Sequence, residues 1–250
     1  MSEIKYTESY VAFLDILGFK NLITSKTCAD IYSIFALINI GSKTEFKLND
    51  EALPVFNNVK YKIMSDSIIL YIDAFIPDAF FALVHSCQRL QMLLLNCNTP
   101  ILLRGGIAKG GLFSDGDILF GKGLTDAYLI ENNVAVYPRI IFTNQLLKEA
   151  QKNYAKISPG IDSLSFYKAR DEFCCVNFMT IEFFTDFHTS AHYVNNLLSY
   201  CQSYIDLSSE PSIREKYLWL KVEVILLAEN KKGVLNLTEE GKKVIERWHI

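Results

Sequence analysis

The sequence predicts an α+β domain of ferredoxin-like, or palm, topology (βαββαβ) with its helices on one face of the sheet, followed by a helical C-terminal appendage. Three observations predict this class. Apolar segments of strand length alternate with amphipathic segments in the order strand, helix, strand, strand, helix, strand. Glycines and short polar turns separate these segments, and only helical patterns follow near the C-terminus. We therefore expect one domain over residues 1–185 and an appendage over residues 190–250.

The first strand is expected in the stretch Tyr10–Phe19, YVAFLDILGF. Its apolar and aromatic residues are bounded by Gly18, which fits a buried strand better than a helix. Asp15 is the exception within this run. Because an ionised carboxylate in a dry core costs several kcal/mol unless it is paired or binds a cation, Asp15 needs a partner.

Helical periodicity follows over residues 19–40, with a cap at Thr27 or Asp30. Residues 42–58 are polar and indicate a loop, and residues 59–74 form two apolar runs around a short turn that contains Asp66. A strand, a tight turn and a second strand are the natural interpretation of that pattern.

The remaining segments alternate in the same way. They are a helix at 77–97, a strand at 101–111, a hairpin turn at 114–116, a helix at 121–132, a strand at 137–143, a helix at 144–152, two short strands within 166–178, and three helices at 193–207, 212–229 and 238–248. The strand at 101–111 contains glycines beyond Arg104. Glycine weakens a strand, so these positions predict that a backbone or a ligand comes very close.

In this topology the end of the first strand and the turn of the neighbouring hairpin lie side by side, so Asp15 and Asp66 are expected to converge. Two such carboxylates can hold Mg²⁺ or Mn²⁺ and leave room for substrate phosphates. A two-metal site stabilises both the attacking and the leaving oxygen at phosphorus, which indicates nucleotidyl transfer. The alternative is structural: Asp66 serves the turn and Asp15 ends the strand.

Composition limits the partners. Half of the 250 residues are hydrophobic and the net charge is −3, with no cluster of lysine and arginine, so we expect no nucleic-acid partner. The six cysteines are scattered without metal-ligand spacing and are expected to be reduced core thiols. No secretion signal and no membrane span are evident, which predicts a cytoplasmic protein without a membrane partner.

Four segments, in this order, resemble motifs of the class III nucleotidyl cyclases, the adenylyl and guanylyl cyclases. They are FLDILGF at 13–19, KIMSD at 62–66, LRGGIAKG at 103–110 and FGKGLTDAYLIE at 120–131, with a weaker fifth, YKARDEFCCVNF, at 167–178. The resemblance implies conversion of a nucleoside triphosphate to a 3′,5′-cyclic mononucleotide and pyrophosphate, with Mg²⁺ or Mn²⁺ as cofactor. Because active sites of this family form between two such domains, it also implies a homodimer.

The resemblance also implies residue roles at the phosphates. Asp15 and Asp66 would be metal ligands, and the backbone carbonyl of Ile16 would complete the shell. The amides of Gly18 and Phe19 would meet the triphosphate.

Four basic residues receive roles in the same way. Arg104 would contact the phosphates, or else be a surface arginine at a strand edge. Lys62 would face the base, as in members that use ATP, or else be a solvated strand lysine. Lys168 or Arg170 would neutralise the β- and γ-phosphates.

The sequence departs from the family in the helix after FG. The asparagine and the arginine that steady the transition state there are replaced by Thr125 and Leu129. Their loss should cost orders of magnitude in rate unless Lys109, Lys122 or a partner chain substitutes. Asp117 lies one residue away from the usual base-selecting position, so the base stays open; divergent bacterial members make cyclic pyrimidine nucleotides in phage defence.

Two other functions compete with a cyclase. The first is a catalytically silent cyclase-like domain that binds a nucleotide as a sensor, which Thr125 and Leu129 motivate. The second is a palm-type synthase of linear or cyclic oligonucleotides, which has the same topology but normally a GGDD-like turn that this chain lacks.

Overall fold

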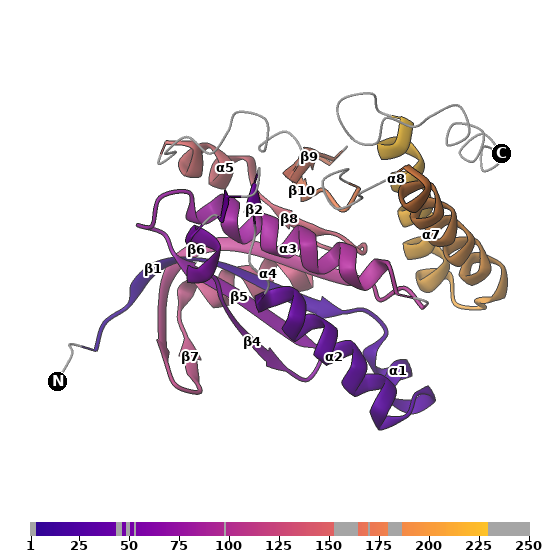
Figure 1. Ribbon diagram of the computed structural model, residues 1–250, viewed down its shortest axis with the longest axis horizontal. Coiled ribbons are helices and arrows are strands. Elements are labelled where there is room, and N and C mark those ends of the chain that lie inside the picture. The colour runs from indigo at the N-terminus through magenta and orange to yellow at the C-terminus, as the bar shows by residue number, and fades with distance from the viewer. Residues whose placement is uncertain are drawn as a thin grey trace.

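The computed structural model describes residues 4–43, 47–48, 51–52, 54–97, 99–152, 165–169, 171–179 and 187–229. The architecture is the α+β class that the sequence predicts: helices pack on one large sheet, and two long C-terminal helices lie together at one end of the molecule (Figure 1). The helix expected at 238–248 lies outside the described residues, as does most of the expected domain boundary.

The large sheet has the strand order β4-β5-β1-β6-β8-β10-β9, with β7 paired to β6. Its strands are β1 (Thr7–Ile16), β4 (Lys60–Met64), β5 (Ser67–Asp73), β6 (Leu103–Asp115), β7 (Ile118–Phe120), β8 (Ile140–Phe142), β9 (Phe166–Lys168) and β10 (Cys174–Val176), and a separate pair is β2 (Lys47–Leu48) with β3 (Glu51–Ala52). Strands β6 and β8 are parallel, and the other paired neighbours are antiparallel. The order β4-β5-β1-β6 is the predicted ferredoxin-like arrangement.

The helices also follow the predicted order. They are α1 (Phe19–Ser25), α2 (Cys28–Lys43), the 3₁₀ helix η1 (Pro54–Asn58), α3 (Ala79–Leu95), α4 (Lys122–Asn133), α5 (Asn144–Gln151), α7 (Phe187–Leu207) and α8 (Pro211–Glu229). At the start of α2 the Asp30 amide donates to the Thr27 hydroxyl (3.2 Å), and the Thr27 amide donates to the Asp30 carboxylate (3.0 Å). This reciprocal pair is a capping box and confirms the predicted cap.

Side chains of β1 alternate between two buried faces of the sheet. Leu14 and its even-numbered neighbours pack in the main core with α3, whereas Val11 and Phe13 pack with Ala127 of α4. The sequence predicts helices on one face, and α4 is the correction, because it covers the opposite face. The physical reason is that β1 is apolar on both faces, so each face needs a cover.

The glycines of β6 explain how α4 approaches so closely. A Cβ atom added at Gly106 would lie 2.5 Å from the carbonyl oxygen of Ala127, and one added at Gly110 would lie 2.9 Å from the amide nitrogen of Gly123. Of the two explanations that the sequence left open, a nearby backbone rather than a ligand accounts for these glycines.

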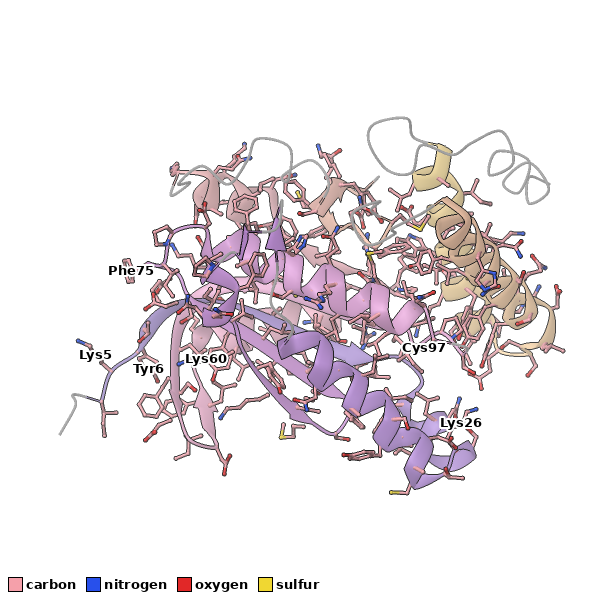
Figure 2. The ribbon with its side chains drawn as sticks, in the orientation of Figure 1. Lys5, Tyr6, Lys26, Lys60, Phe75 and Cys97 are labelled. Carbon is pink, nitrogen blue, oxygen red and sulfur yellow. The ribbon has the colours of Figure 1, made fainter. Side chains whose placement is uncertain are left out.

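Replacing Gly106 with alanine is expected to destabilise the protein by about 1–3 kcal/mol, because the helix backbone must move away from the new methyl group. Gly111→Ala is the matched control: its Cβ would lie 3.2 Å from Tyr6, whose side chain is 60% exposed and can yield (Figure 2). Urea unfolding monitored by circular dichroism measures both. Equal stability losses in the two variants would contradict this account of the α4 contact.

The C-terminal helices pack on each other and on one end of the sheet. Leu102, just before β6, belongs to their core, and Leu17, just after β1, packs against it. Farther along α8, Trp219 stacks on Tyr137 with ring centroids 5.1 Å apart. The helical pair therefore covers the end of the sheet where β1 finishes and β6 begins. Among the described residues, no helix is both long enough and apolar enough to cross a membrane.

Candidate active site

The two candidate metal ligands lie at neighbouring strand ends. Asp15 is opposite Ser67 in the β1–β5 ladder, and Asp66 occupies the turn just before Ser67. The amide of Ile16 donates to the carbonyl of Asp66 at 3.0 Å. Ser65 takes a left-handed backbone conformation (φ 56°), which tightens the turn. The expected side-by-side placement of the two aspartates is thus present in the backbone.

Arg104 on β6 is paired directly opposite Asp15 on β1. Its Nη2 atom is 3.5 Å from the Asp15 carboxylate and 2.5 Å from the carboxylate of Glu131 on α4. The Arg104 side chain is 20% exposed and β6 is an inner strand, so the alternative of a surface arginine at a strand edge is wrong. The anions beside Arg104 are carboxylates of the chain itself, and its contact with phosphates stays a prediction.

Electrostatics around Asp15 favour an additional cation. Burial raises the pKa of Asp15; Arg104 and Lys216 oppose this rise, and Asp66 adds to it. Burial likewise raises the pKa of Glu131, with Arg104 opposing and Asp15 and Asp66 adding. Asp15, Asp66 and Glu131 therefore interact with one another around Arg104. Burial is the largest cause of both raised pKa values, and a bound cation would offset this penalty on the ionised carboxylates.

The donor set fits an ion of the magnesium type. Among the described residues, no group of three or more His, Cys, Asp or Glu side chains forms a complete metal site. Mg²⁺ needs less than that, because it is bound through one or two carboxylates and completes its shell with water and substrate phosphates. The carboxylates of Asp15 and Asp66 and the carbonyl of Ile16 are oxygen donors of this kind.

The turn that follows β1 contains the predicted phosphate contacts. Gly18 has φ +75°, a left-handed conformation that glycine adopts without strain, and its carbonyl accepts from the Asn21 and Leu22 amides. Phe19 begins α1 and packs against Phe35, with ring centroids 5.9 Å apart. Contacts of the Gly18 and Phe19 amides with a triphosphate stay a prediction.

Lys62 lies where strand β4 meets the turn between β6 and β7. It pairs with Ile69 in the β4–β5 ladder, and Ile69 belongs to the same sheet face as α4. Its Nζ atom donates to the carbonyl of Gly116 at 2.7 Å, in the turn between β6 and β7. Lys62 and Asp117, the two positions that the resemblance relates to the base, are therefore neighbours across two hairpins.

Other predicted residues are not brought to Asp15. Thr125 is exposed on α4 and its hydroxyl donates to the Gly121 carbonyl at 3.3 Å. Leu129, one turn later, is 45% exposed. Lys168, on β9, forms an ion pair with Glu172. Strands β6, β8 and β10 lie between β9 and β1. Within a single chain the assignment of Lys168 to the phosphates is therefore not supported, and Arg170 lies outside the described residues.

The sequence analysis did not identify one charged residue near the site. Lys216, on α8, lowers the pKa of Asp15 and so acts on the candidate metal site. No motif could have indicated it, because Lys216 follows Asp15 by most of the chain length and belongs to a helix outside the motifs. Only the packing of α8 against the end of the sheet brings it there.

Known proteins similar to this chain are found among solved structures. No protein-family model matches the chain, and no curated protein matches it. Among solved structures, the catalytic core of a rhodopsin-guanylyl cyclase with converted specificity, in complex with ATPαS, is similar: 14% identity, 69% of this chain, 96% of that chain and a TM-score of 0.46.

Two further solved structures are similar. One is a bacterial light-regulated adenylyl cyclase, with 14% identity, 71% of this chain, 54% of that chain and a TM-score of 0.43. The other is an adenylate/guanylate cyclase/hydrolase from Silicibacter pomeroyi, with 14% identity, 68% of this chain, 95% of that chain and a TM-score of 0.42.

Proposed function

We propose that the protein is a nucleotidyl cyclase, which converts a nucleoside triphosphate to a 3′,5′-cyclic mononucleotide and pyrophosphate. One observation carries the proposal: Asp15 and Asp66 lie at adjacent strand ends, joined through the Ile16–Asp66 hydrogen bond. The burial that raises the pKa of Asp15 supports it, since a divalent cation would stabilise this carboxylate in its ionised form.

Each residue of the cluster has a defined task in this proposal. Asp15, Asp66 and the Ile16 carbonyl would hold Mg²⁺ or Mn²⁺, which when bound supplies Lewis-acid stabilisation of phosphate oxygens and lowers the pKa of the attacking 3′-hydroxyl. Arg104 holds Asp15 in its charged form and is oriented by Glu131. Lys62 would donate to the base from the neighbouring hairpin.

The active unit is proposed to be a homodimer. Thr125 and Leu129 lie on the exposed side of α4, where a second copy of the chain would have access to them. In the family that the motifs resemble, sites form between two domains, so α4 of the second copy would contribute there. The reaction then needs groups from both copies.

A catalytically silent nucleotide-binding domain is the second candidate, and a specific observation favours it. Arg104 already supplies a cation 3.5 Å from Asp15, and Leu129 offers no charge to a transition state. A domain of this kind would bind a nucleotide without turning it over.

Incubation of the purified protein with each of the four nucleoside triphosphates and Mn²⁺ tests the proposal. Chromatography and mass spectrometry identify the nucleotide products, and a coupled assay follows pyrophosphate. A cyclic mononucleotide that disappears with EDTA is the expected result. Oligonucleotide products would instead identify a palm-type synthase, and metal-independent nucleotide binding without turnover would identify the silent domain.

A further inference from the structure

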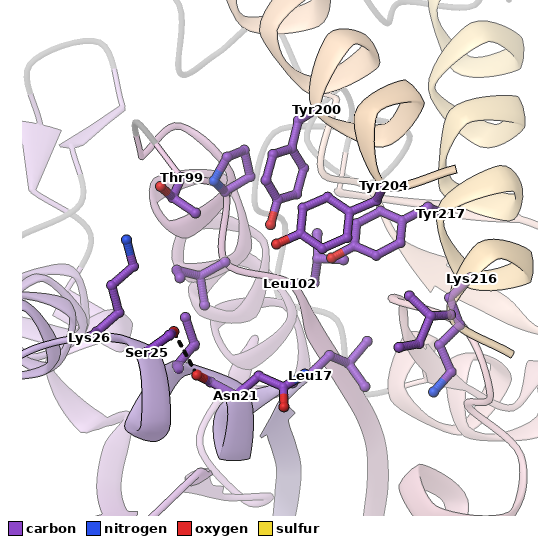
Figure 3. A pocket seen from close by; sticks show the side chains of 15 residues that line it. Leu17, Asn21, Ser25, Lys26, Thr99, Leu102, Tyr200, Tyr204, Lys216 and Tyr217 are labelled. Carbon is purple, nitrogen blue, oxygen red and sulfur yellow. Dashed lines mark hydrogen bonds between the residues drawn. The ribbon is translucent and has the colours of Figure 1, made fainter. Parts of the chain in front are cut away.

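A cavity of about 470 Å³ lies between α1, the segment before β6, and the C-terminal helices α7 and α8 (Figure 3). Its size is within the range of small-molecule sites in proteins. The buried side chains of Ile101 and Leu102 and the partly buried Leu22 provide an apolar floor. A third of its lining residues belong to the C-terminal helices, which none of the resembling motifs covers.

Three tyrosines form the polar wall of this cavity. Tyr204 on α7 stacks on Tyr217 of α8, with ring centroids 4.4 Å apart and an interplanar angle of 21°. The ring centroid of Tyr200 is 4.9 Å from that of Tyr204. Figure 3 shows the three hydroxyl groups pointing toward the cavity from the same side. They are hydrogen-bond donors that converge on one region.

The three tyrosine hydroxyls have more O–H donors than they use in hydrogen bonds with one another. The Tyr200 hydroxyl interacts with those of Tyr204 and Tyr217, and burial raises the pKa of Tyr200 and of Tyr217. Tyr200 and Tyr217 therefore stay protonated. A chain of three hydroxyls forms two mutual hydrogen bonds from three O–H donors, so one donor remains for an acceptor in the cavity.

Two lysines add positive charge at opposite sides of the cavity (Figure 3). Lys26 follows α1 and Lys216 belongs to α8. Neither lysine belongs to any ion pair between described residues. Donor hydroxyls and ammonium groups around an apolar floor together favour a ligand with an anionic head and an apolar body.

We propose that this cavity binds a small organic anion, with its phosphate or carboxylate held by the tyrosine hydroxyls and Lys216 and its apolar body on the floor of Leu22, Ile101 and Leu102. The cavity lining does not include Asp15 or Asp66, and ligand binding there does not depend on cyclase activity. The cavity adjoins the candidate metal site, because Lys216 lowers the pKa of Asp15 and because Leu17 and Gly18 line the cavity.

Calorimetric titration of the full chain in EDTA tests the proposal, since chelation removes any metal-dependent substrate site. The phosphate probes are AMP, CMP, GMP and UMP; the carboxylate probes are benzoate and indole-3-acetate; inorganic phosphate is the head group alone. At least one organic probe is expected to bind about tenfold or more tightly than inorganic phosphate, because apolar burial adds to the head-group contacts. Whether the phosphate probes or the carboxylate probes bind more tightly identifies the head group of the ligand.

Variants place the ligand in the cavity. Lys216→Met should weaken binding about 10- to 100-fold, since one charged contact is lost, and Tyr204→Phe should weaken it about 2- to 10-fold. Lys148→Met, at an exposed position of α5, is the matched control and should change nothing. Asp66→Asn should also retain binding, because the metal site is not involved.

Three results would overturn the proposal. They are the failure of every organic probe to bind better than inorganic phosphate, unchanged binding in both Lys216→Met and Tyr204→Phe, and loss of binding in Asp66→Asn. Thermal melting of each variant shows that the fold is intact, and Tyr204→Phe keeps the aromatic stack, so a misfolded Lys216 variant would not decide the question.

Discussion

Turnover of a nucleoside triphosphate is expected to fall about 1,000-fold or more when Asp66 or Asp15 is replaced by asparagine. A cation at phosphoryl oxygens contributes several kcal/mol to the transition state, and each 1.36 kcal/mol is a factor of ten in rate. An amide keeps the size of the side chain but removes the charge that holds the ion. The measurement is kcat for the preferred triphosphate with saturating Mn²⁺.

Asp73→Asn is the matched control for this prediction. Asp73 lies at the opposite end of β5 from Asp66, and its carboxylate accepts from the Phe75 amide, which an amide oxygen can also do. Its turnover should stay close to that of the unaltered protein. If Asp66→Asn and Asp73→Asn were equally active, Asp66 would have no place in the chemistry.

The second large predicted effect is an increase in kcat. Combining Thr125→Asn with Leu129→Arg is expected to raise kcat about 100-fold, since one well-placed donor to a developing charge is worth about 10²–10³ in rate. Both positions are on the exposed side of α4, so the substitutions disturb no core contact. The steady-state rate of cyclic-nucleotide formation measures the gain.

Leu129→Gln, in the same Thr125→Asn background, separates charge from polarity. It places a polar side chain of similar length on α4 without the guanidinium. The arginine variant should exceed the glutamine variant by most of the expected factor. Equal rates for these two variants would mean that α4 does not face a reacting phosphate in the assembled protein.

Much of the central fold follows from local sequence patterns. The apolar run of β1, the turn at Asp66 and the helical periodicity before and after them predict the ferredoxin-like order, which the strand order confirms. The convergence of Asp15 and Asp66 follows from that order alone. These features are predictable because period, turn chemistry and strand adjacency are encoded over short stretches.

Other features depend on packing between distant segments. The glycines of β6 indicate a close approach but do not name α4 as the neighbour, so the second covered face was not predicted. The pairing of Arg104 with Glu131 requires α4 to cross β6 at that point. Lys216 reaches the site only through the docking of α8. The exposed Cys28 likewise departs from the expectation of core thiols.

The central claim is that Asp15 and Asp66 form one divalent-cation site, and Mn²⁺ binding measured by water-proton relaxation tests it most directly. The unaltered protein should bind Mn²⁺ saturably, and Asp15→Asn and Asp66→Asn should each lose about tenfold or more in affinity, since one of few charged ligands is gone. Asp73→Asn should bind as the unaltered protein does.

When the same titration is repeated at decreasing pH, the direction in which Mn²⁺ affinity changes can be predicted. Burial raises the pKa of Asp15 above its usual 3.8, so protons compete with Mn²⁺ at a higher pH than they would at an ordinary aspartate. Affinity should therefore weaken as pH falls, beginning above that usual value. Saturable Mn²⁺ binding that is lost in both asparagine variants is the result that we predict, and equal Mn²⁺ affinity in all four proteins would contradict it.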